Sequence, residues 1–252
     1  MKIIVLGSGT STGVPEIGCK CEVCTSTDPK DKRLRTSLLI HAEGRNILLD
    51  CGPDFRAQIL PQPFERLHAV LISHEHYDHV GGLDDLRPFC RFGEIPIYAD
   101  AYTVTQVKKR IPYCFSEQLY PGVPALSLCP VIPTESFHVA GVKVTPIQVF
   151  HGKLPILGYR IGNMAYITDM LTLPEEEYEK LSGLDCLFMN ALRINPHATH
   201  QTLEQALENT KRIGAKETYF IHMSHHMGLH RKIEDLLPTG VHLSYDGLEI
   251  TL

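Results

Sequence analysis

A dense run of metal-binding side chains follows an apolar segment in the first third of the chain. The apolar segment is Ala69–Ser73, and the run after it reads His74-Glu75-His76-Tyr77-Asp78-His79. His74 and His76 alternate along extended backbone, so both side chains can face the same way. Asp78 and His79 lie just past the turn, where they can face a second ion. Imidazole and carboxylate groups suit zinc, manganese or iron, so the run predicts a metal centre at the end of a buried strand.

Short strands recur along the chain and indicate the fold class. Runs of β-branched residues bounded by turn residues alternate with stretches of helical periodicity. Thr202 and Gln205 have the spacing of a capped helix start. Strands dominate the first third and mix with helices later, which predicts packed sheets with helices outside, in one domain over residues 1–252. The expected strands are Ile3–Leu6, Ser37–Ile40, Ile47–Asp50, Ala69–Ser73, Ile95–Tyr98, Val142–Val149, Ala165–Thr168, Cys186–Asn190, Thr218–His222 and Leu248–Leu252. The expected helices are Asp84–Phe89, Ala101–Arg110, Pro174–Leu181, Leu203–Ile213 and Arg231–Leu237.

Composition and charge exclude several classes of protein. The 252 residues are 43% hydrophobic and 21% charged, an ordinary globular mixture that excludes a disordered or fibrous chain. The 24 Lys and Arg residues are outnumbered by 29 Asp and Glu residues, and this acidic balance disfavours a nucleic-acid partner. No apolar run reaches about 18 residues, and the N-terminus lacks the pattern of a signal peptide. These observations predict a cytoplasmic protein without a membrane partner.

A second group of potential ligands is the cysteine cluster of residues 19–24. Cys19, Cys21 and Cys24 have a C-x-C-x-x-C spacing, and close cysteines in a reducing compartment bind metal more often than they form disulfides. A closed tetrahedral zinc site needs a fourth ligand. His225 and His226 are both candidates, but neighbouring residues on extended backbone point apart, so only one of them is expected to serve. The remaining cysteines are expected to be small buried apolar residues; they are Cys51, Cys90, Cys114, Cys129 and Cys186.

The order of the metal-binding residues resembles the metallo-β-lactamase superfamily. After the run at residues 74–79, three further stations follow as they do in that family, at His151, Asp169 and His222. The resemblance implies a four-layer αββα sandwich of the α/β (α+β) class, with two mixed β-sheets and helices outside. It implies two active-site ions with Asp169 bridging them. One ion would be held by His74, His76, His151 and Asp169, and the other by Asp78, His79, His222 and Asp169. Asp50 matches an early aspartate of the family that would orient a ligand histidine.

Within the superfamily, the cysteine triplet and a histidine three residues after the last active-site ligand resemble the PhnP-like cyclic phosphodiesterases of phosphonate degradation. This resemblance implies a structural zinc on Cys19, Cys21, Cys24 and His225. It also places a histidine beside the metals, a role carried here to His200, with His197 as the alternative. Such an imidazole titrates near neutral pH and could protonate a leaving alkoxide.

The resemblance implies hydrolysis of a small phosphodiester, such as a cyclic ribose phosphate, by a metal-bound hydroxide. His200, Asp78 and Asp169 would be the catalytic residues. Manganese and zinc both suit the ligands, and the PhnP resemblance favours manganese. The expected partners are a small-molecule substrate and, as in many family members, a second copy of the chain. Arg87, Arg91 and Arg193 lie near the motif loops and are candidate phosphate ligands or surface ion-pair partners.

Three alternatives come from the same superfamily. A glyoxalase II-like thioester hydrolase shares the bridging aspartate but adds a C-terminal helical region, whereas this chain is expected to end in strands. A tRNA 3′-end endonuclease would carry a long glycine- and proline-rich arm and a basic face. A relative linked to pyrroloquinoline quinone biosynthesis shares the cysteine triplet but has altered metal stations, whereas all seven stations are intact here.

Overall fold

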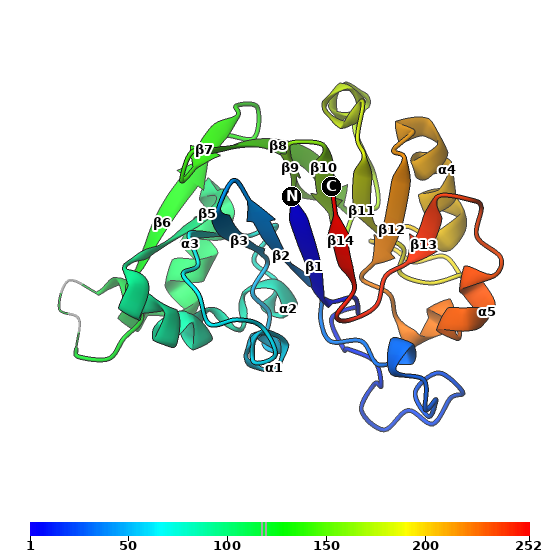
Figure 1. Cartoon of the computed structure of the whole chain (residues 1–252), viewed down its shortest axis with the longest axis horizontal. Helices are drawn as coiled ribbons and strands as arrows, with labels where there is room; N and C mark the ends of the chain where they lie inside the picture. Colours follow the sequence, from blue (N-terminus) through cyan, green and yellow to red (C-terminus); the bar gives the residue numbers. More distant parts are fainter. Residues whose placement is uncertain (117, 119) are drawn as a thin grey trace.

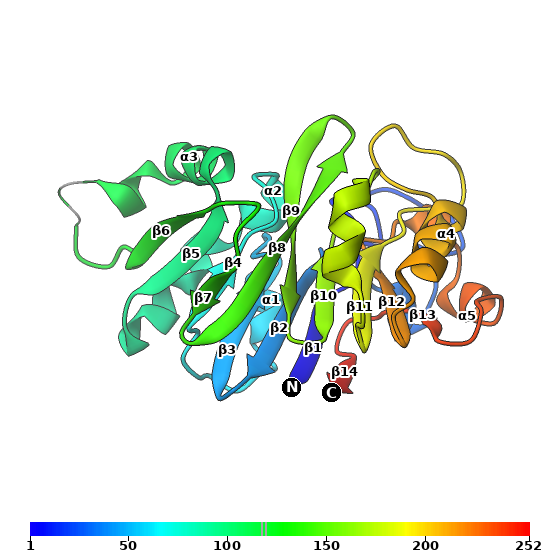
Figure 2. The same cartoon turned by 90° about the horizontal axis from the view of Figure 1, so that it is seen from above.

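Two β-sheets packed face to face form the centre of the molecule. The structure is a computed structural model that describes residues 1–116, 118 and 120–252, and these residues form two seven-stranded sheets. Helices α1, α2 and α3 cover the outer face of one sheet, and α4 and α5 cover the other (Figures 1 and 2). The αββα sandwich with two mixed sheets is therefore confirmed.

The first sheet has the strand order β14-β1-β2-β3-β4-β5-β6. Strands β14 to β3 are antiparallel neighbours, and β4, β5 and β6 continue from β3 in parallel. The strands are β1 (Lys2–Gly7), β2 (Ser37–Ala42), β3 (Arg45–Leu49), β4 (Ala69–Leu71), β5 (Ile95–Asp100), β6 (Leu126–Val131) and β14 (Glu249–Thr251).

The second sheet has the strand order β13-β12-β11-β10-β9-β8-β7. Here β13 to β10 are parallel, and β9, β8 and β7 are antiparallel. The strands are β7 (Phe137–Val139), β8 (Val142–His151), β9 (Leu154–Ile161), β10 (Met164–Ile167), β11 (Cys186–Asn190), β12 (Glu217–Ile221) and β13 (Val241–Leu243).

The helices are short, and several are 3₁₀ helices. Helix α4 begins with the predicted capping box of Thr202 and Gln205 and ends at Gly214 in the left-handed conformation. The α-helices are α1 (Phe55–Ile59), α2 (Tyr77–Val80), α3 (Ala101–Arg110), α4 (Leu203–Ile213) and α5 (His230–Glu234). The 3₁₀ helices are η1 (Pro29–Asp31), η2 (Leu83–Phe92), η3 (Pro112–Phe115), η4 (Glu175–Leu181) and η5 (His225–Met227). Among the described residues, no helix is long and apolar enough to cross a membrane.

Three apolar layers hold the four layers of secondary structure together. Between the sheets, Tyr159, Tyr166 and Phe188 are fully buried against strands of the first sheet. Two further clusters join each sheet to its own helices. Central strands bury both faces, which explains why Leu38–Ile40 is apolar at every position. Each such buried side chain stabilises the fold by about 1.5–3 kcal/mol.

The sequence does not predict β6, β7, β9 or β13. Strand β9 carries Pro155 and Gly158, which interrupt a strand pattern. Gly158 is required there because a Cβ atom would lie 2.7 Å from the carbonyl oxygen of Tyr166. Strand β6 contains Pro130 but lies at the sheet edge, where proline is tolerated. The segments expected as helices at 84–89 and 174–181 lie in the 3₁₀ helices η2, which contains Pro88, and η4.

Candidate metal centre

The metal-binding side chains collect where strands of both sheets end. Asp50 follows β3, Asp169 lies just past β10, and His222 follows β12. All three have left-handed backbone, with φ angles of 56°, 55° and 55°. Non-glycine residues adopt this conformation uncommonly, and such residues are frequent at turns and functional sites. Three left-handed residues at strand ends of the two sheets therefore mark this edge of the sandwich as a candidate functional site.

Three histidines form the first ligand group. The candidate ligand atoms of His74, His76 and His151 all lie within 4.8 Å of one another. Nε2 of His74 is 3.0 Å from Nδ1 of His76 and 3.8 Å from Oδ2 of Asp169. The Nδ1–H of His151 donates to the carbonyl oxygen of Thr199 at 3.0 Å, which leaves Nε2 free to bind an ion.

The second ligand group is fully enclosed. Asp78, His79, Asp169 and His222 are buried, and their ligand atoms lie within 4.8 Å of one another. Nε2 of His79 is 3.1 Å from Oδ2 of Asp78 and 3.3 Å from Oδ1 of Asp169. Nε2 of His222 is 3.2 Å from the same Asp169 oxygen. Buried imidazole and carboxylate groups at this spacing form a donor set for a divalent cation.

Asp169 lies between the two groups. Its Oδ1 faces His79 and His222, and its Oδ2 faces His74 of the first group. Thr168 donates its hydroxyl to Oδ1 at 2.6 Å and so fixes the carboxylate plane. A single carboxylate with one oxygen toward each group can bridge two ions.

Charge in the site is balanced between acids and imidazoles. Burial opposes ionisation of Asp169, yet the imidazoles of His222 and His79 hold the pKa of this carboxyl well below its usual value. Burial likewise opposes a charged His79, but Asp78 and the neighbouring carboxylates raise the pKa of His79 well above its usual value. Nε2 of His79 is buried without a hydrogen-bond partner among the described residues. Such an orphaned nitrogen beside two carboxylates fits a metal ligand, so the residues present suit the implied ions.

Asp50 forms hydrogen bonds that orient a histidine of the second ligand group. Its carboxylate accepts hydrogen bonds from Nδ1 of His79 at 2.8 Å, from the Tyr166 hydroxyl at 2.6 Å and from the Ser73 backbone at 2.7 Å. Because Asp50 accepts from Nδ1, Nε2 of His79 can carry the lone pair that binds a metal. The Ser73 hydroxyl also donates to Asp50 and lies 2.9 Å from Nδ1 of His74. Asp50 thus contacts one ligand group directly and the other through Ser73.

His200 lies beside the two ligand groups, where the family resemblance places it, and its role remains a prediction. Its Nε2 is 3.1 Å from Oδ2 of Asp169, and together with His151 these residues form a further set of potential ligands. Nδ1 of His200 is 3.2 Å from Nδ1 of His197. Burial lowers the pKa of His200 to about 4, so its imidazole is neutral at pH 7.

The cysteine cluster closes around one histidine. Nδ1 of His225 lies 3.2 Å from Sγ of Cys19, 3.5 Å from Sγ of Cys21 and 3.2 Å from Sγ of Cys24. The structure therefore brings His225 to the thiols, whereas His226 contacts the far nitrogen of His225 at 3.0 Å. We call Cys19, Cys21, Cys24 and His225 the cysteine clip.

The cysteine clip and the metal centre share one chain segment. The segment His222–His225 carries the last residue of the second ligand group at one end and the clip histidine at the other. The Met223 N–H donates to the Ser8 carbonyl, and Met223 accepts from the Thr10 N–H. The His222 N–H donates to the Thr36 hydroxyl at 3.1 Å. Hydrogen bonds of Met223 and His222 therefore join this segment to Ser8, Thr10 and Thr36.

The arginines that the sequence suggested are engaged elsewhere. Arg87 pairs with Asp84 at 2.8 Å, and Arg91 lies over the ring of Phe64 at 5.9 Å. Arg193 donates to the carbonyls of Asn195 and Pro196 and so holds the loop that carries His197 and His200.

Sequence reasoning missed Arg110, a basic side chain next to the metal-binding run. Its guanidinium donates to the Glu75 carbonyl at 3.2 Å and lies 5.8 Å from the ring of Tyr77. Both partners lie within the run of residues 74–79. The sequence signal was weak, because a basic residue in the last turn of a helix is also favoured by the helix dipole.

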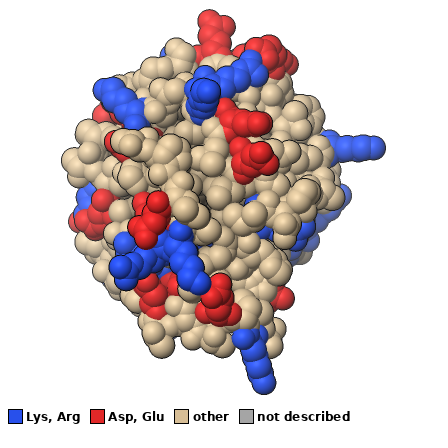
Figure 3. Space-filling view, turned by 90° about the vertical axis from the view of Figure 1, so that its right-hand side faces the viewer, with Lys and Arg blue, Asp and Glu red and all other residues tan. Residues whose placement is uncertain are grey.

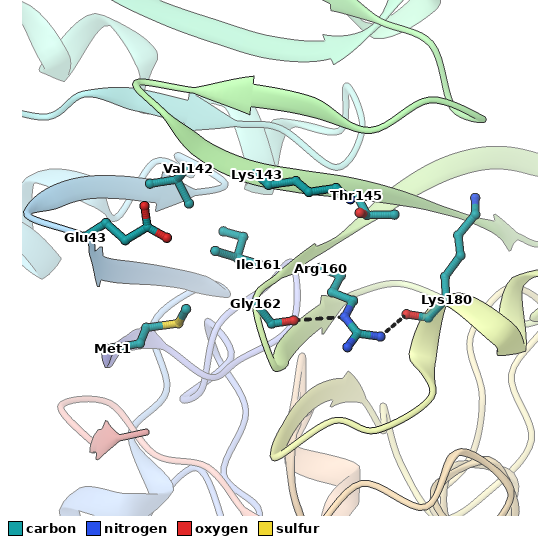
Figure 4. Close-up of a pocket in the computed structure, with 9 residues that line it drawn as sticks. All are labelled: Met1, Glu43, Val142, Lys143, Thr145, Arg160, Ile161, Gly162 and Lys180. Carbon is teal, nitrogen blue, oxygen red and sulfur yellow. Dashed lines mark hydrogen bonds between the residues drawn. The ribbon is translucent and has the colours of Figure 1, made fainter.

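A cavity of about 400 Å³ lies at the opposite end of the sandwich, beside Met1 and the start of β8 (Figure 4). Two of its three basic side chains are already satisfied, because Arg160 donates to the carbonyls of Gly162 and Lys180, and the Lys180 amine pairs with Glu177. On the face that Figure 3 shows, basic and acidic side chains are intermixed. Neither feature adds a residue to the metal centre.

Comparisons with known proteins agree with this geometry. Residues 45–223 match the β-lactamase superfamily domain. A crystal structure of a diphosphatase from the PhnP family superposes with a TM-score of 0.93 and is 40% identical, covering 100% of this chain and 97% of that one. Zinc-bound PqqB from Methylobacterium extorquens has a TM-score of 0.80 at 22% identity and full coverage of both chains, which shows a shared fold.

One curated relative is a much longer protein. A Porphyromonas gingivalis protein named octanoyltransferase is 51% identical over 251 residues, which are 99% of this chain and 51% of that protein. The chain spans about half the length of the curated relatives it matches. The chain belongs to the metallo-β-lactamase superfamily.

Proposed function

We propose that this chain is a di-metal phosphodiesterase that hydrolyses a small phosphodiester, with a cyclic ribose phosphate as the preferred class. The observation that carries the proposal is Asp169, which turns one oxygen toward each of two ligand groups. The similarity to a PhnP-family diphosphatase, 40% identical over the whole chain, supports phosphoryl chemistry.

The two ligand groups and the shared aspartate would hold two divalent ions, manganese or zinc. His74, His76 and His151 would bind one ion, His79, His222 and Asp78 the other, and Asp169 both. Ions bound there supply charge neutralisation at phosphate oxygens and a lowered pKa for a coordinated water. Asp50 and the Thr199 carbonyl would fix the tautomers of His79 and His151.

His200 would donate the proton that the leaving alkoxide requires. Because burial lowers the pKa of His200 to about 4, the side chain has to gain a proton before it can release one. Its Nε2 lies on Asp169, and its Nδ1 lies 3.2 Å from His197. His197 is the imidazole within hydrogen-bond distance of that Nδ1, although burial lowers the pKa of His197 as well.

The test is release of nitrophenolate from bis(p-nitrophenyl) phosphate by metal-free protein supplied with manganese or zinc. Turnover should require added metal and should fall at least about 100-fold in Asp78→Ala, since a principal charge on the second group is lost. Asp235→Ala, at an exposed aspartate, is the matched control. Normal turnover by Asp78→Ala, or turnover without metal, would contradict the proposal.

A second candidate is hydrolysis of an acyl thioester, as in the glyoxalase II-like alternative. The observation that favours it is the name octanoyltransferase on a relative 51% identical to nearly the whole chain. That name describes a protein of twice the matched length, so the acyl transfer can belong to its other half. An octanoyl thioester offered beside the phosphodiester, under the same metal conditions, separates the two reactions.

Three further proposals complete this assignment. The cysteine clip would bind a structural zinc, because three thiols and an imidazole nitrogen match the ligands of closed zinc sites. The free thiols suit a reducing compartment, in agreement with a cytoplasmic location. We propose that the chain forms a homodimer. Light scattering measures its oligomeric state in solution.

A further inference from the structure

A mainly apolar cavity of about 350 Å³ opens between the start of α3 and the β8–β9 hairpin. Its walls include Tyr102 on α3, Pro133 after β6, and Leu154 and Leu157 on the hairpin. This volume lies within the range of about 300–1,000 Å³ that small-molecule pockets occupy. None of the residues that line this cavity belongs to the two ligand groups of the metal centre.

The cavity lies beside the candidate metal centre. Leu154 is the register partner of His151 across the hairpin. The Leu157 N–H donates at 3.0 Å to the carbonyl of Ser73, the residue before His74. Figure 2 shows α2, α3 and the turn of the β8–β9 hairpin at the same end of the molecule. The cavity and the first ligand group therefore share the hairpin and the end of β4.

The chemistry of the walls selects an uncharged occupant. Asp100 is the acidic residue of the wall. Its carboxylate caps α3, where it accepts hydrogen bonds from the Thr103 N–H at 2.9 Å and the Thr103 hydroxyl at 2.8 Å. Tyr102 is 53% exposed, so much of its ring is available to a ligand. An aromatic ring beside proline and leucine side chains favours burial of apolar or aromatic groups of a ligand.

We propose that this cavity is a subsite for an uncharged aromatic or alkyl group carried by the phosphate compound that the metal centre binds. The inference rests on the proposed function, because the phosphate must be held at the metal ligands. It specifies that the phosphodiester carries, beside the ribose phosphate, an aromatic or alkyl substituent. Tyr102 and Leu154 are then residues that determine specificity.

Binding of phosphonates to the metal-loaded protein tests the subsite without requiring turnover. Methylphosphonate and phenylphosphonate share the charged group and differ in the apolar one. Calorimetry should show that phenylphosphonate binds about tenfold or more tightly to the wild type, as expected for burial of a ring. Tyr102→Ala should lose most of this preference, and Pro133→Asp, which puts a charge at the wall, should lose it as well. Tyr120→Ala, at a tyrosine that is 56% exposed and outside the cavity walls, should keep it.

The outcomes separate this inference from the proposed reaction. Equal affinity for both phosphonates in the wild type, or an undiminished preference in both cavity variants, would overturn the subsite. Loss of the preference in Tyr120→Ala as well would also overturn it, since the effect would not be local. Failure to hydrolyse any phosphodiester, with the phosphonate preference intact, would reject the reaction and keep the subsite.

Discussion

Oδ2 of Asp50 lies 2.8 Å from Nδ1 of His79, although the two residues are 29 positions apart in the chain. The same oxygen accepts the Tyr166 hydroxyl from the second sheet at 2.6 Å. Asp50 thus joins the first sheet, the metal-binding run and the second sheet at one buried point.

The first prediction concerns this contact. Asp50→Asn should weaken binding of the ion at His79 by about 10–100-fold, the usual effect of losing an outer hydrogen-bond partner of a metal ligand. Competition with a fluorescent chelator measures the affinity. Tyr166→Phe, which removes one donor to Asp50 and leaves the carboxylate, should have a smaller effect. Unchanged affinity in Asp50→Asn would show that His79 needs no partner.

The second prediction concerns the shared carboxylate. Asp169→Asn preserves the shape of the side chain and removes its charge, so the dialysed protein should retain fewer than two active-site ions. Phosphodiesterase kcat/KM should fall at least about 100-fold. Metal analysis by mass spectrometry provides the primary measurement, and Asp185→Asn, at a half-buried surface position, is the control. Two retained ions with normal turnover would rule out a bridge.

The third prediction separates the two histidines next to the cysteines. His225→Ala and Cys21→Ser should each lose one equivalent of zinc and melt at a lower temperature, by about 2–4 °C for each kcal/mol lost in a chain of this size. His226→Ala and Cys90→Ser should retain the zinc, because neither side chain lies in the cysteine clip. Zinc loss in His226→Ala alone would mean that His226, and not His225, is the fourth zinc ligand.

The fourth prediction is a pH dependence of stability. Burial raises the pKa of Asp246 to about 6, against an ordinary value of 3.8, although the Leu34 and Ser8 N–H groups oppose the shift. The folded state therefore binds a proton between pH 6 and pH 4 that the unfolded state does not. This group stabilises the fold as the pH falls from about 6 to about 4, and that contribution is lost as the pH rises, by at most about 1.4 kcal/mol per pH unit.

Urea unfolding at pH 4.5 and pH 7 checks this sign. The free energy of unfolding of the wild type, relative to Asp246→Asn, should be larger at pH 4.5 than at pH 7. Asp235→Asn, at an exposed position, should show no such difference. A relative free energy that is the same at both pH values would mean that Asp246 ionises normally in the folded protein.

Much of the fold follows from local pattern. The central strands are apolar on both faces, and the helix at Leu203–Ile213 has its capping box in the sequence. Strand β9 could not be predicted locally, because Pro155 and Gly158 interrupt its pattern. The need for Gly158 arises from the Tyr166 carbonyl on the next strand, which only the tertiary structure brings close.

The metal centre shows the same division. The run at His74–His79 was recognisable because its residues are consecutive. The stations at His151, Asp169 and His222 were found only through family resemblance, and the structure now brings them together. Their metal-binding roles remain predictions. The left-handed backbone at Asp169 and His222 has no signal in sequence periodicity, because neighbouring strands impose it.

The short segment from His222 to His225 brings a histidine that faces an exposed thiol and a residue of a buried ligand group onto one stretch of chain. Oxidants attack accessible thiols, and Cys21 is exposed at the surface. Oxidation there would remove one of the three thiols that face His225, which lies three residues after His222. Chemical damage that begins at the protein surface would thus start within a few residues of the buried centre.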